Sequence, residues 1–158
     1  MNTKVLRVGY LMRYISTDPK SITLSLIEAA LKRVDPAYSI ANVEVDDLGD
    51  LMFGDLRCAI IDINRPGDDI FEDDLAEFRD LVGQGNSASE QIVRQTLAGA
   101  TALVVIEALW PGEDAEPILA RIDPLWDWLF ATYSGLSQAD NEGFYDRTGL
   151  ILERNFTL

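Results

Sequence analysis

The order in which strand-like and helix-like segments follow one another constrains the fold of this chain more than any single motif does. Residues 5–14 alternate as a strand does, and residues 22–34 carry apolar side chains at the three- and four-residue spacing of an amphipathic helix. Two further strands are expected over residues 38–46 and 51–64, separated by the turn-rich residues 46–50. The first half of the chain therefore predicts a β-α-β-β unit.

Capping and turn residues predict where the helices begin and end. Asp18 followed by Pro19 has the cap-then-proline pattern of a helix start, so we expect the first helix to begin there. A strongly acidic amphipathic helix follows the third strand, and Gly83 closes it. Ser87 and Glu90 then have the S-x-x-E spacing of a capping box, which predicts another helix directly after this glycine.

The second half of the chain repeats the same order of elements. Residues 101–109 are the strongest candidate strand, and Pro124 predicts that two consecutive helices or one kinked helix follow them. Turn residues divide residues 136–156 into short strands, which we expect to form a hairpin. We therefore predict one α+β domain over residues 1–158, in which two β-α-β-β units form a mainly antiparallel sheet with helices on one face.

This order of elements, together with the C-terminal run from Thr101 to Leu152, resembles duplicated βαββ domains. That group includes uncharacterised bacterial families and, more distantly, ligand-sensing domains similar to the gyrase-inhibitor protein. The resemblance implies the same two-unit architecture and transfers no functional residue to this sequence.

The charge of the chain is strongly acidic and unevenly distributed. The sequence has 27 Asp and Glu against 13 Lys and Arg, a net charge of -14, and residues 44–80 hold 13 of the acids with only three of the cations. Nucleic acids and anionic membranes are bound through Lys and Arg, so we expect neither as a partner. A protein partner with a basic surface is favoured, and the alternative is that the acids only keep the protein soluble.

The absence of histidine from the sequence removes several classes of catalytic site. There can be no Ser-His-Asp or Cys-His machinery, no HExxH zinc site and no facial triad. Neither G-x-G-x-x-G nor G-x-x-x-x-G-K-[ST] occurs, so no phosphate-binding loop is expected. We predict a binding protein without catalytic residues, metal or cofactor, and an enzyme that uses only carboxylates remains the alternative.

The sequence also favours a cytoplasmic protein. The single cysteine, Cys58, lies in an apolar run and is expected to be an inert packed thiol that suits a reducing compartment. The longest apolar runs are interrupted by Asp62 and Glu107, well before the roughly 20 residues that span a bilayer. The first residues lack the apolar core of a signal peptide.

The two acids within apolar strands, Asp62 and Glu107, are the first candidate binding site. Strand alternation allows both side chains to lie on one face of the sheet, where burial raises the pKa of a carboxyl group or lets it anchor a cationic ligand. Arg7 and Arg13 in the first strand are candidate counter-ions. The alternative is that both acids face solvent on the side of the sheet without helices.

Two further candidates come from a loop and from the tryptophans. Asn64 and Arg65 open the strand-to-helix junction over residues 64–69, whose oxygen ligands can hold a hard cation; the alternative is an N-cap at Asp68 or Asp69. The tryptophans are expected to cover the core or to stack on a ligand or partner. They are Trp110, Trp126 and Trp128.

Two functions follow from these residues. The main hypothesis is a non-catalytic, acidic, cytoplasmic interaction protein that neutralises or regulates a basic protein partner. The alternative is a small-molecule sensor that uses Glu107 in a sheet cavity to hold a cationic or aromatic ligand. We also expect a homodimer formed through the non-helical face, which carries Ile60, Val105 and Leu109.

Overall fold

A computed structural model describes residues 8–45, 47–110, 112 and 114–154 of the chain. These residues form an α+β fold, as predicted, with four helices and one antiparallel sheet in the strand order β2-β3-β4-β5-β1-β6-β7-β8. The first unit contains β1 (Val8–Ser16), α2 (Leu24–Val34), β2 (Tyr38–Glu44), β3 (Leu48–Phe53) and β4 (Leu56–Asn64). The second contains β5 (Ala102–Trp110), α5 (Glu116–Thr132), β6 (Gly135–Ala139), β7 (Gly143–Asp146) and β8 (Gly149–Glu153). The connection contains α3 (Asp69–Val82) and α4 (Ala88–Ala98).

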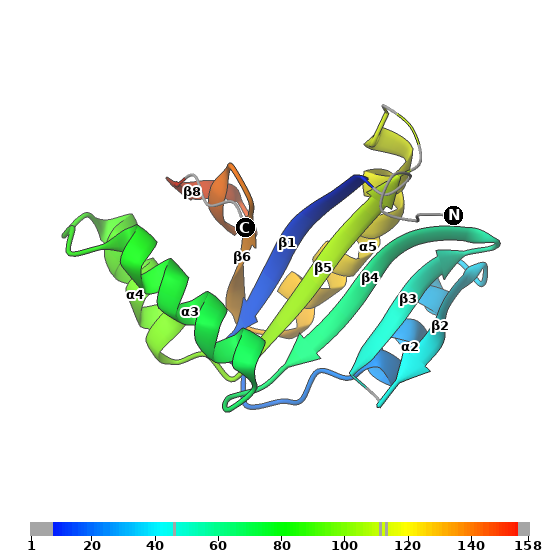
Figure 1. Cartoon of the computed structure of the whole chain (residues 1–158), viewed down its shortest axis with the longest axis horizontal. Helices are drawn as coiled ribbons and strands as arrows, with labels where there is room; N and C mark the ends of the chain where they lie inside the picture. Colours follow the sequence, from blue (N-terminus) through cyan, green and yellow to red (C-terminus); the bar gives the residue numbers. More distant parts are fainter. Residues whose placement is uncertain (1–7, 46, 111, 113, 155–158) are drawn as a thin grey trace.

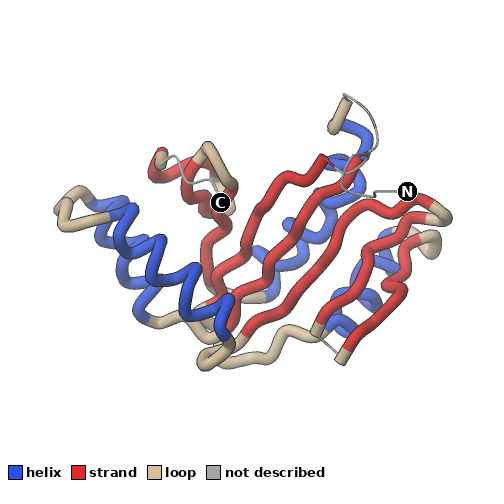
Figure 2. Tube along the Cα trace, in the orientation of Figure 1, coloured by secondary structure: helices blue, strands red, loops and turns tan. Residues whose placement is uncertain are grey.

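The helices lie on both faces of the sheet (Figures 1 and 2). Strand β1 shows the division, because Met12 and Tyr14 belong to the core under α2 and α5, whereas Ile15 belongs to the core under α3 and α4. The helices of the two β-α-β-β units therefore share one face, as expected, but the prediction of a second face without helices is wrong. The helices of the connection pack on the other face, because their own apolar stripe, which includes Phe78 and Val93, also has to be buried.

Each helix pair covers only part of its face. On one face α2 packs beside β2 and against α5, and α5 packs over β4 and β5, so strands β6 to β8 extend beyond both helices. On the other face α4 contacts β1, β6 and β8, and the strands at the β2 end extend beyond it. The sheet thus has one open region on each face, at opposite ends.

The first helix begins later than the sequence predicts. Thr23 is the N-cap of α2 and accepts the N–H of Leu26 at 3.1 Å, so the expected start at Asp18 and Pro19 is wrong. The carboxylate of Asp18 instead accepts the N–H of Lys20 at 2.9 Å and the N–H of Ser134 at 3.3 Å. A side chain that satisfies these two donors holds the chain in a turn before the helix.

Two other helix boundaries lie at the predicted capping residues. Ser87 and Glu90 form the predicted capping box of α4, and Gly83 ends α3 with a φ of 69° that favours glycine. Helix α5 continues through Pro124 as one helix. The residues after it form three antiparallel strands, β6 to β8, one more than the expected hairpin contains.

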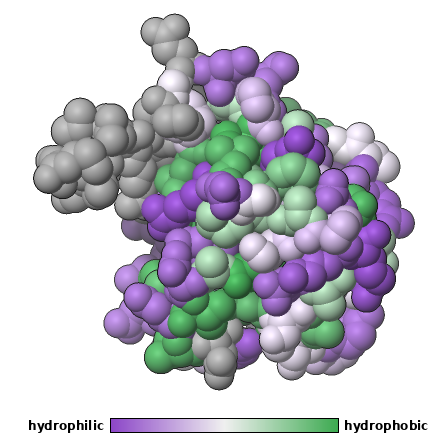
Figure 3. Space-filling model, turned by 90° about the vertical axis from the view of Figure 1, so that its right-hand side faces the viewer, coloured by the Kyte–Doolittle hydropathy of each residue, from purple (hydrophilic) through white to green (hydrophobic). Residues whose placement is uncertain are grey.

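The end of the molecule built from α2 and β2 exposes apolar side chains among polar ones (Figure 3). They include Leu26 and Val34 on α2 and Val43 on β2. Strand β2 is an edge of the sheet, and its register with β3 shifts between Ala41 and Glu44. Such a bulge bends an edge strand and hinders pairing with another chain.

Candidate functional site

Asp62 and Glu107 lie on the same face of the sheet, in the open region beyond α3 and α4. In the pairing of β4 with β5, Asp62 is opposite Val105 and Ile60 is opposite Glu107, so the two acids are diagonal neighbours. Both residues are partly buried. Burial raises the pKa of Asp62, with a smaller contribution from the negative charge of Asp47, and a hydrogen bond from Asn64 opposes the shift.

Arg13, an expected counter-ion of these acids, is the centre of a different cluster. Its Nε lies 2.7 Å from Asp74 on α3, and its Nη1 lies 2.8 Å from Asp140 and 2.9 Å from Gln138. The side chain is fully buried, with its guanidinium carbon 5.3 Å from the centre of the Phe78 ring. The contact between Arg13 and Asp74 holds α3 against β1, which lies between β5 and β6 in the sheet. Arg7, the other expected counter-ion, lies outside the described residues.

Arg65 and its neighbours join the sheet to two helices. The guanidinium of Arg65 lies 2.7 Å from Asp47 and donates to the carbonyl of Ile22 at 3.1 Å, and its backbone N–H donates to Asp68. Asp68 occupies the N-cap position of α3, one of the two positions in the alternative interpretation, but its carboxylate accepts the N–H of Arg65 and no N–H of the helix. Asn64 is buried and donates to the carbonyl of Asp62 at 3.2 Å. In the part of the chain that is described, no group of three acids or cysteines is arranged to hold a metal.

The tryptophans separate in space. Trp110 and Trp128 are partly buried against the core under α2 and α5, and Trp128 packs edge-to-face on Tyr133 with ring centres 5.5 Å apart. Trp126 contacts the same core and also lines a groove beside α5. It is the tryptophan best placed to contact another molecule.

The groove, which we call the α5 groove, lies where β6 and β7 extend beyond α5 and has a volume of about 450 Å³. Its lining is rich in aromatic rings and carboxylates. The rings come from Tyr10 on β1, Trp126 and Phe130 on α5, and Tyr145 on β7. The charged residues of the lining are Asp123, Glu142, Asp146 and Arg147.

Glu142 is held by two tyrosines of the α5 groove. One oxygen of its carboxylate accepts the hydroxyl of Tyr10, and the other accepts the hydroxyl of Tyr145. Burial, together with this hydrogen bond and the negative charge of Glu142, raises the pKa of Tyr145 to about 12, so the tyrosine remains a donor at neutral pH. The plane of the carboxylate is therefore fixed from both sides.

The other charges of the α5 groove differ in how they are held. Asp146 accepts the backbone N–H of Thr148 at 2.8 Å and also its hydroxyl, and these hydrogen bonds lower the pKa of Asp146. Burial, with a contribution from Asp127, raises the pKa of Asp123. Arg147 donates to the carbonyl of Phe130 at 2.8 Å, at the C-terminal end of α5.

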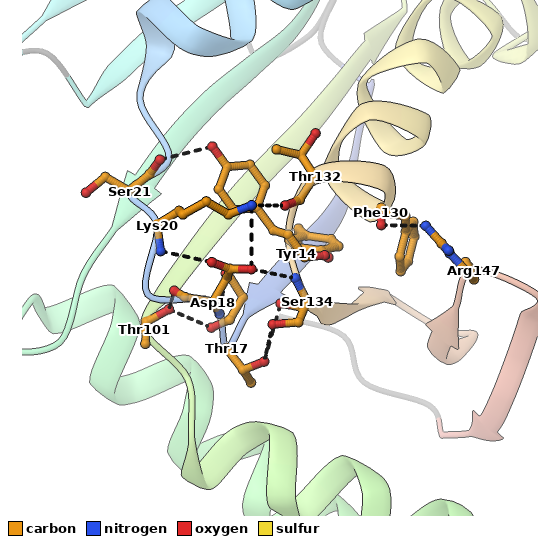
Figure 4. A network of polar contacts seen from close by, with 12 residues as sticks. Tyr14, Thr17, Asp18, Lys20, Ser21, Thr101, Phe130, Thr132, Ser134 and Arg147 are labelled. Carbon is orange, nitrogen blue, oxygen red and sulfur yellow. Dashed lines mark hydrogen bonds and ion pairs between the residues drawn. The ribbon is translucent and has the colours of Figure 1, made fainter.

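A network of polar contacts fixes the end of α5 that borders the groove (Figure 4). The Nζ of Lys20 donates to the carbonyl of Thr132 at 2.6 Å, and the hydroxyl of Tyr14 donates to the carbonyl of Tyr133 at 2.7 Å. Together with Arg147 these donors satisfy carbonyls that a helix end leaves without partners inside the helix. The position of Phe130 in the groove lining is thereby set.

The outer side of α3 is a second charged feature. Phe71, Leu75 and Phe78 face the core, and the opposite side of the helix is exposed. Five exposed carboxylates lie on that side and at its margins, with one exposed cation, Arg79. They are Asp69, Glu72, Asp73, Glu77 and Asp80.

Sequence reasoning identified only part of this arrangement. It singled out Trp126 as a residue that can stack on a ligand, and it recognised the turn that contains Glu142. It missed Tyr10, Tyr145 and Asp123 as members of one site. No local pattern joins residues of β1, α5 and β7, because they meet only through the strand order of the sheet.

Comparison with protein-family models, with curated proteins and with solved structures finds no match to this chain. None of the helices in the described ranges combines the length and the apolar character needed to cross a membrane.

Proposed function

We propose that this protein is a non-catalytic interaction domain that binds a basic protein partner and thereby neutralises or regulates it. The observation that carries the proposal is the outer side of α3, where five exposed carboxylates accompany one exposed arginine. The net charge of -14 supports it, because an acidic surface attracts a basic partner over distances of about a Debye length, roughly 10 Å at 0.1 M salt. The buried, unpaired Cys58 suits a cytoplasmic setting.

Matched charge variants test this proposal in pull-downs from the native host. Asp73→Asn, Glu77→Gln and Asp80→Asn together remove three charges from α3. Their control removes three exposed acids elsewhere, through Glu44→Gln, Asp55→Asn and Glu153→Gln. Both triple variants have the same net charge, so a difference between them reports the position of the acids and not their number.

We expect a basic protein to be captured by the wild type and by the control variant, and to be lost with the α3 variant. Capture should also weaken between 0.1 M and 1 M salt, where the Debye length falls to about 3 Å. Equal capture by both triple variants, binding that salt does not weaken, or an acidic captured protein would contradict the proposal.

A sensor for a small cationic or aromatic ligand is the second candidate function. The α5 groove supports it, because a volume of about 450 Å³ with an aromatic lining lies in the range of small-molecule sites. Glu107, on which this hypothesis first rested, does not line that groove. Calorimetric titration with small organic cations tests the sensor, which requires binding at micromolar concentration without any protein partner.

A further inference from the structure

The α5 groove combines three features that recognise one kind of chemical group. It presents aromatic rings, it carries three carboxylates against one guanidinium, and one of those carboxylates has a fixed orientation. Aromatic faces and carboxylates both attract cations. The lining therefore favours a cationic occupant with a flat or apolar body.

The geometry around Glu142 favours an arginine side chain over a lysine side chain as the cationic occupant. Each oxygen of the Glu142 carboxylate already accepts one tyrosine hydroxyl, from Tyr10 or Tyr145, and a carboxylate oxygen can accept a second hydrogen bond. A guanidinium donates two parallel N–H groups to the two oxygens of such a carboxylate, and its plane can stack on a ring such as that of Trp126. An ammonium group has neither the two-pronged geometry nor the flat face.

The cation already in the lining does not fill this role. Arg147 is directed to the carbonyl of Phe130 at the end of α5, as Figure 4 shows. Asp146 is held by the backbone and hydroxyl of Thr148. Glu142 and Asp123 are thus the carboxylates that remain to meet an incoming cation.

We infer that the α5 groove binds the guanidinium of an arginine side chain presented by the protein partner. The source of this arginine rests on the proposed function, whereas the chemistry of the groove can be tested without the partner. The outer side of α3 belongs to the opposite face of the sheet, so the two surfaces can be altered separately.

The test uses the full chain with two short peptides, acetyl-Gly-Arg-Gly-amide and acetyl-Gly-Lys-Gly-amide, followed by NMR. We expect the arginine peptide to bind in the millimolar range and to shift the indole N–H signal of Trp126. The lysine peptide should bind at least about fivefold more weakly. Equal binding of the two peptides, or shifts that avoid the groove, would overturn the guanidinium assignment.

Variants of the full chain locate the binding. Glu142→Gln should weaken the arginine peptide by about tenfold, because a charged hydrogen bond is replaced by a neutral one. Tyr145→Phe, which keeps the ring and removes one orienting hydroxyl, should weaken it about threefold. Glu153→Gln on β8 removes the same charge outside the groove lining and should leave affinity within twofold. Equal effects of Glu142→Gln and Glu153→Gln would overturn the site.

The pull-down of the protein partner, repeated with Glu142→Gln, distinguishes a failure of this inference from a failure of the proposed function. If the partner captured in the pull-down is lost with the α3 variant but retained with Glu142→Gln, the groove is not part of the interface and the inference falls while the proposed function stands. If Glu142→Gln reduces capture and Glu153→Gln does not, the arginine comes from the partner. Tight binding of a small guanidinium compound with no effect on partner capture would instead favour the sensor.

Discussion

Replacing Arg13 by methionine should destabilise the protein more than any exposed charge substitution. Methionine keeps most of the length and volume of the side chain but removes the charge that lies 2.7 Å from Asp74 and 2.8 Å from Asp140. Both acids are buried, so the variant leaves carboxylates in the interior without this cation. Removing one partner of a buried ion pair typically costs about 3–5 kcal/mol.

The loss should be visible in both chemical and thermal unfolding. Urea is the suitable denaturant, because guanidinium chloride would also screen the charges under study. For a chain of this size, a loss of about 3–5 kcal/mol corresponds to a fall in Tm of roughly 6–20 °C. Amide hydrogen exchange should accelerate first in α3, which Asp74 anchors to Arg13.

Two control variants test whether the loss of stability comes from the buried cluster around Arg13. Arg57→Met removes an ion pair with Asp50 at 2.9 Å in which the arginine side chain is 49 % exposed. Asp50 is buried but keeps a hydrogen bond from the amide of Asn42 at 2.8 Å, so this variant should cost about 1–2 kcal/mol, less than Arg13→Met. Asp74→Asn leaves Arg13 with Asp140 and an amide oxygen in place of the carboxylate, and should cost less than Arg13→Met. A loss for Arg13→Met no larger than that for Arg57→Met would refute the view that the buried cluster stabilises the fold.

Three further predictions concern the strands and the assembly. Gly143→Ala should cost more than about 2 kcal/mol in urea unfolding, because φ is 141° there and a Cβ would collide with the backbone of β8, whereas Gly149→Ala, with φ 137° and open space, should cost only about 1 kcal/mol. Asp62→Asn should raise the free energy of unfolding at pH 7 by less than about 1 kcal/mol, because burial raises the pKa of this acid in the folded state and its ionisation therefore opposes folding. The gain should shrink as the pH falls through that pKa and vanish below about pH 4, near the pKa of an aspartate in the unfolded chain. Thermal unfolding measured over a series of pH values checks this. We expect a homodimer that covers the open face around Ile60 and Val105, and a single monomer species in sedimentation velocity at micromolar concentration would exclude it.

Local signals predicted the elements of the fold because each depends on a few neighbouring residues. Ser87 and Glu90 satisfy each other's backbone donors across three residues, and the nearly continuous apolar run of β5 reflects burial on both faces. The predicted start of α2 was wrong because the carboxylate of Asp18 accepts a hydrogen bond from the N–H of Ser134, which is 116 residues away in the sequence. A cap signal cannot reveal that a distant amide competes for the same carboxylate.

The position of the candidate site depends on the order of the strands in the sheet, and no local sequence pattern predicts that order. Asp62 and Glu107 lie on one face because each belongs to an alternating strand and the two strands are neighbours. Arg13 was expected to be a counter-ion of these two acids, but the acids that it contacts are Asp74 on α3 and Asp140 after β6, which meet it only in the folded sheet. Glu142 and the two tyrosines that hold it come together in the same way.

Both open regions of the molecule follow from one mismatch between strands and helices. Eight strands about 4.8 Å apart make a sheet roughly 34 Å wide, whereas two adjacent helices about 10 Å in diameter cover only about 20 Å. Because α2 and α5 lie toward the β2 end and α4 lies toward the β8 end, the uncovered strip falls at opposite ends on the two faces. On one face the strip is bordered by the aromatic side of α5 and becomes the α5 groove. On the other face the strip contains the partly buried Asp62 and Glu107 on β4 and β5. A groove with a wall can enclose a single side chain, whereas a strip of sheet without such a wall is suited to contact with another surface, so we assign the arginine to the first and a second copy of the chain to the other.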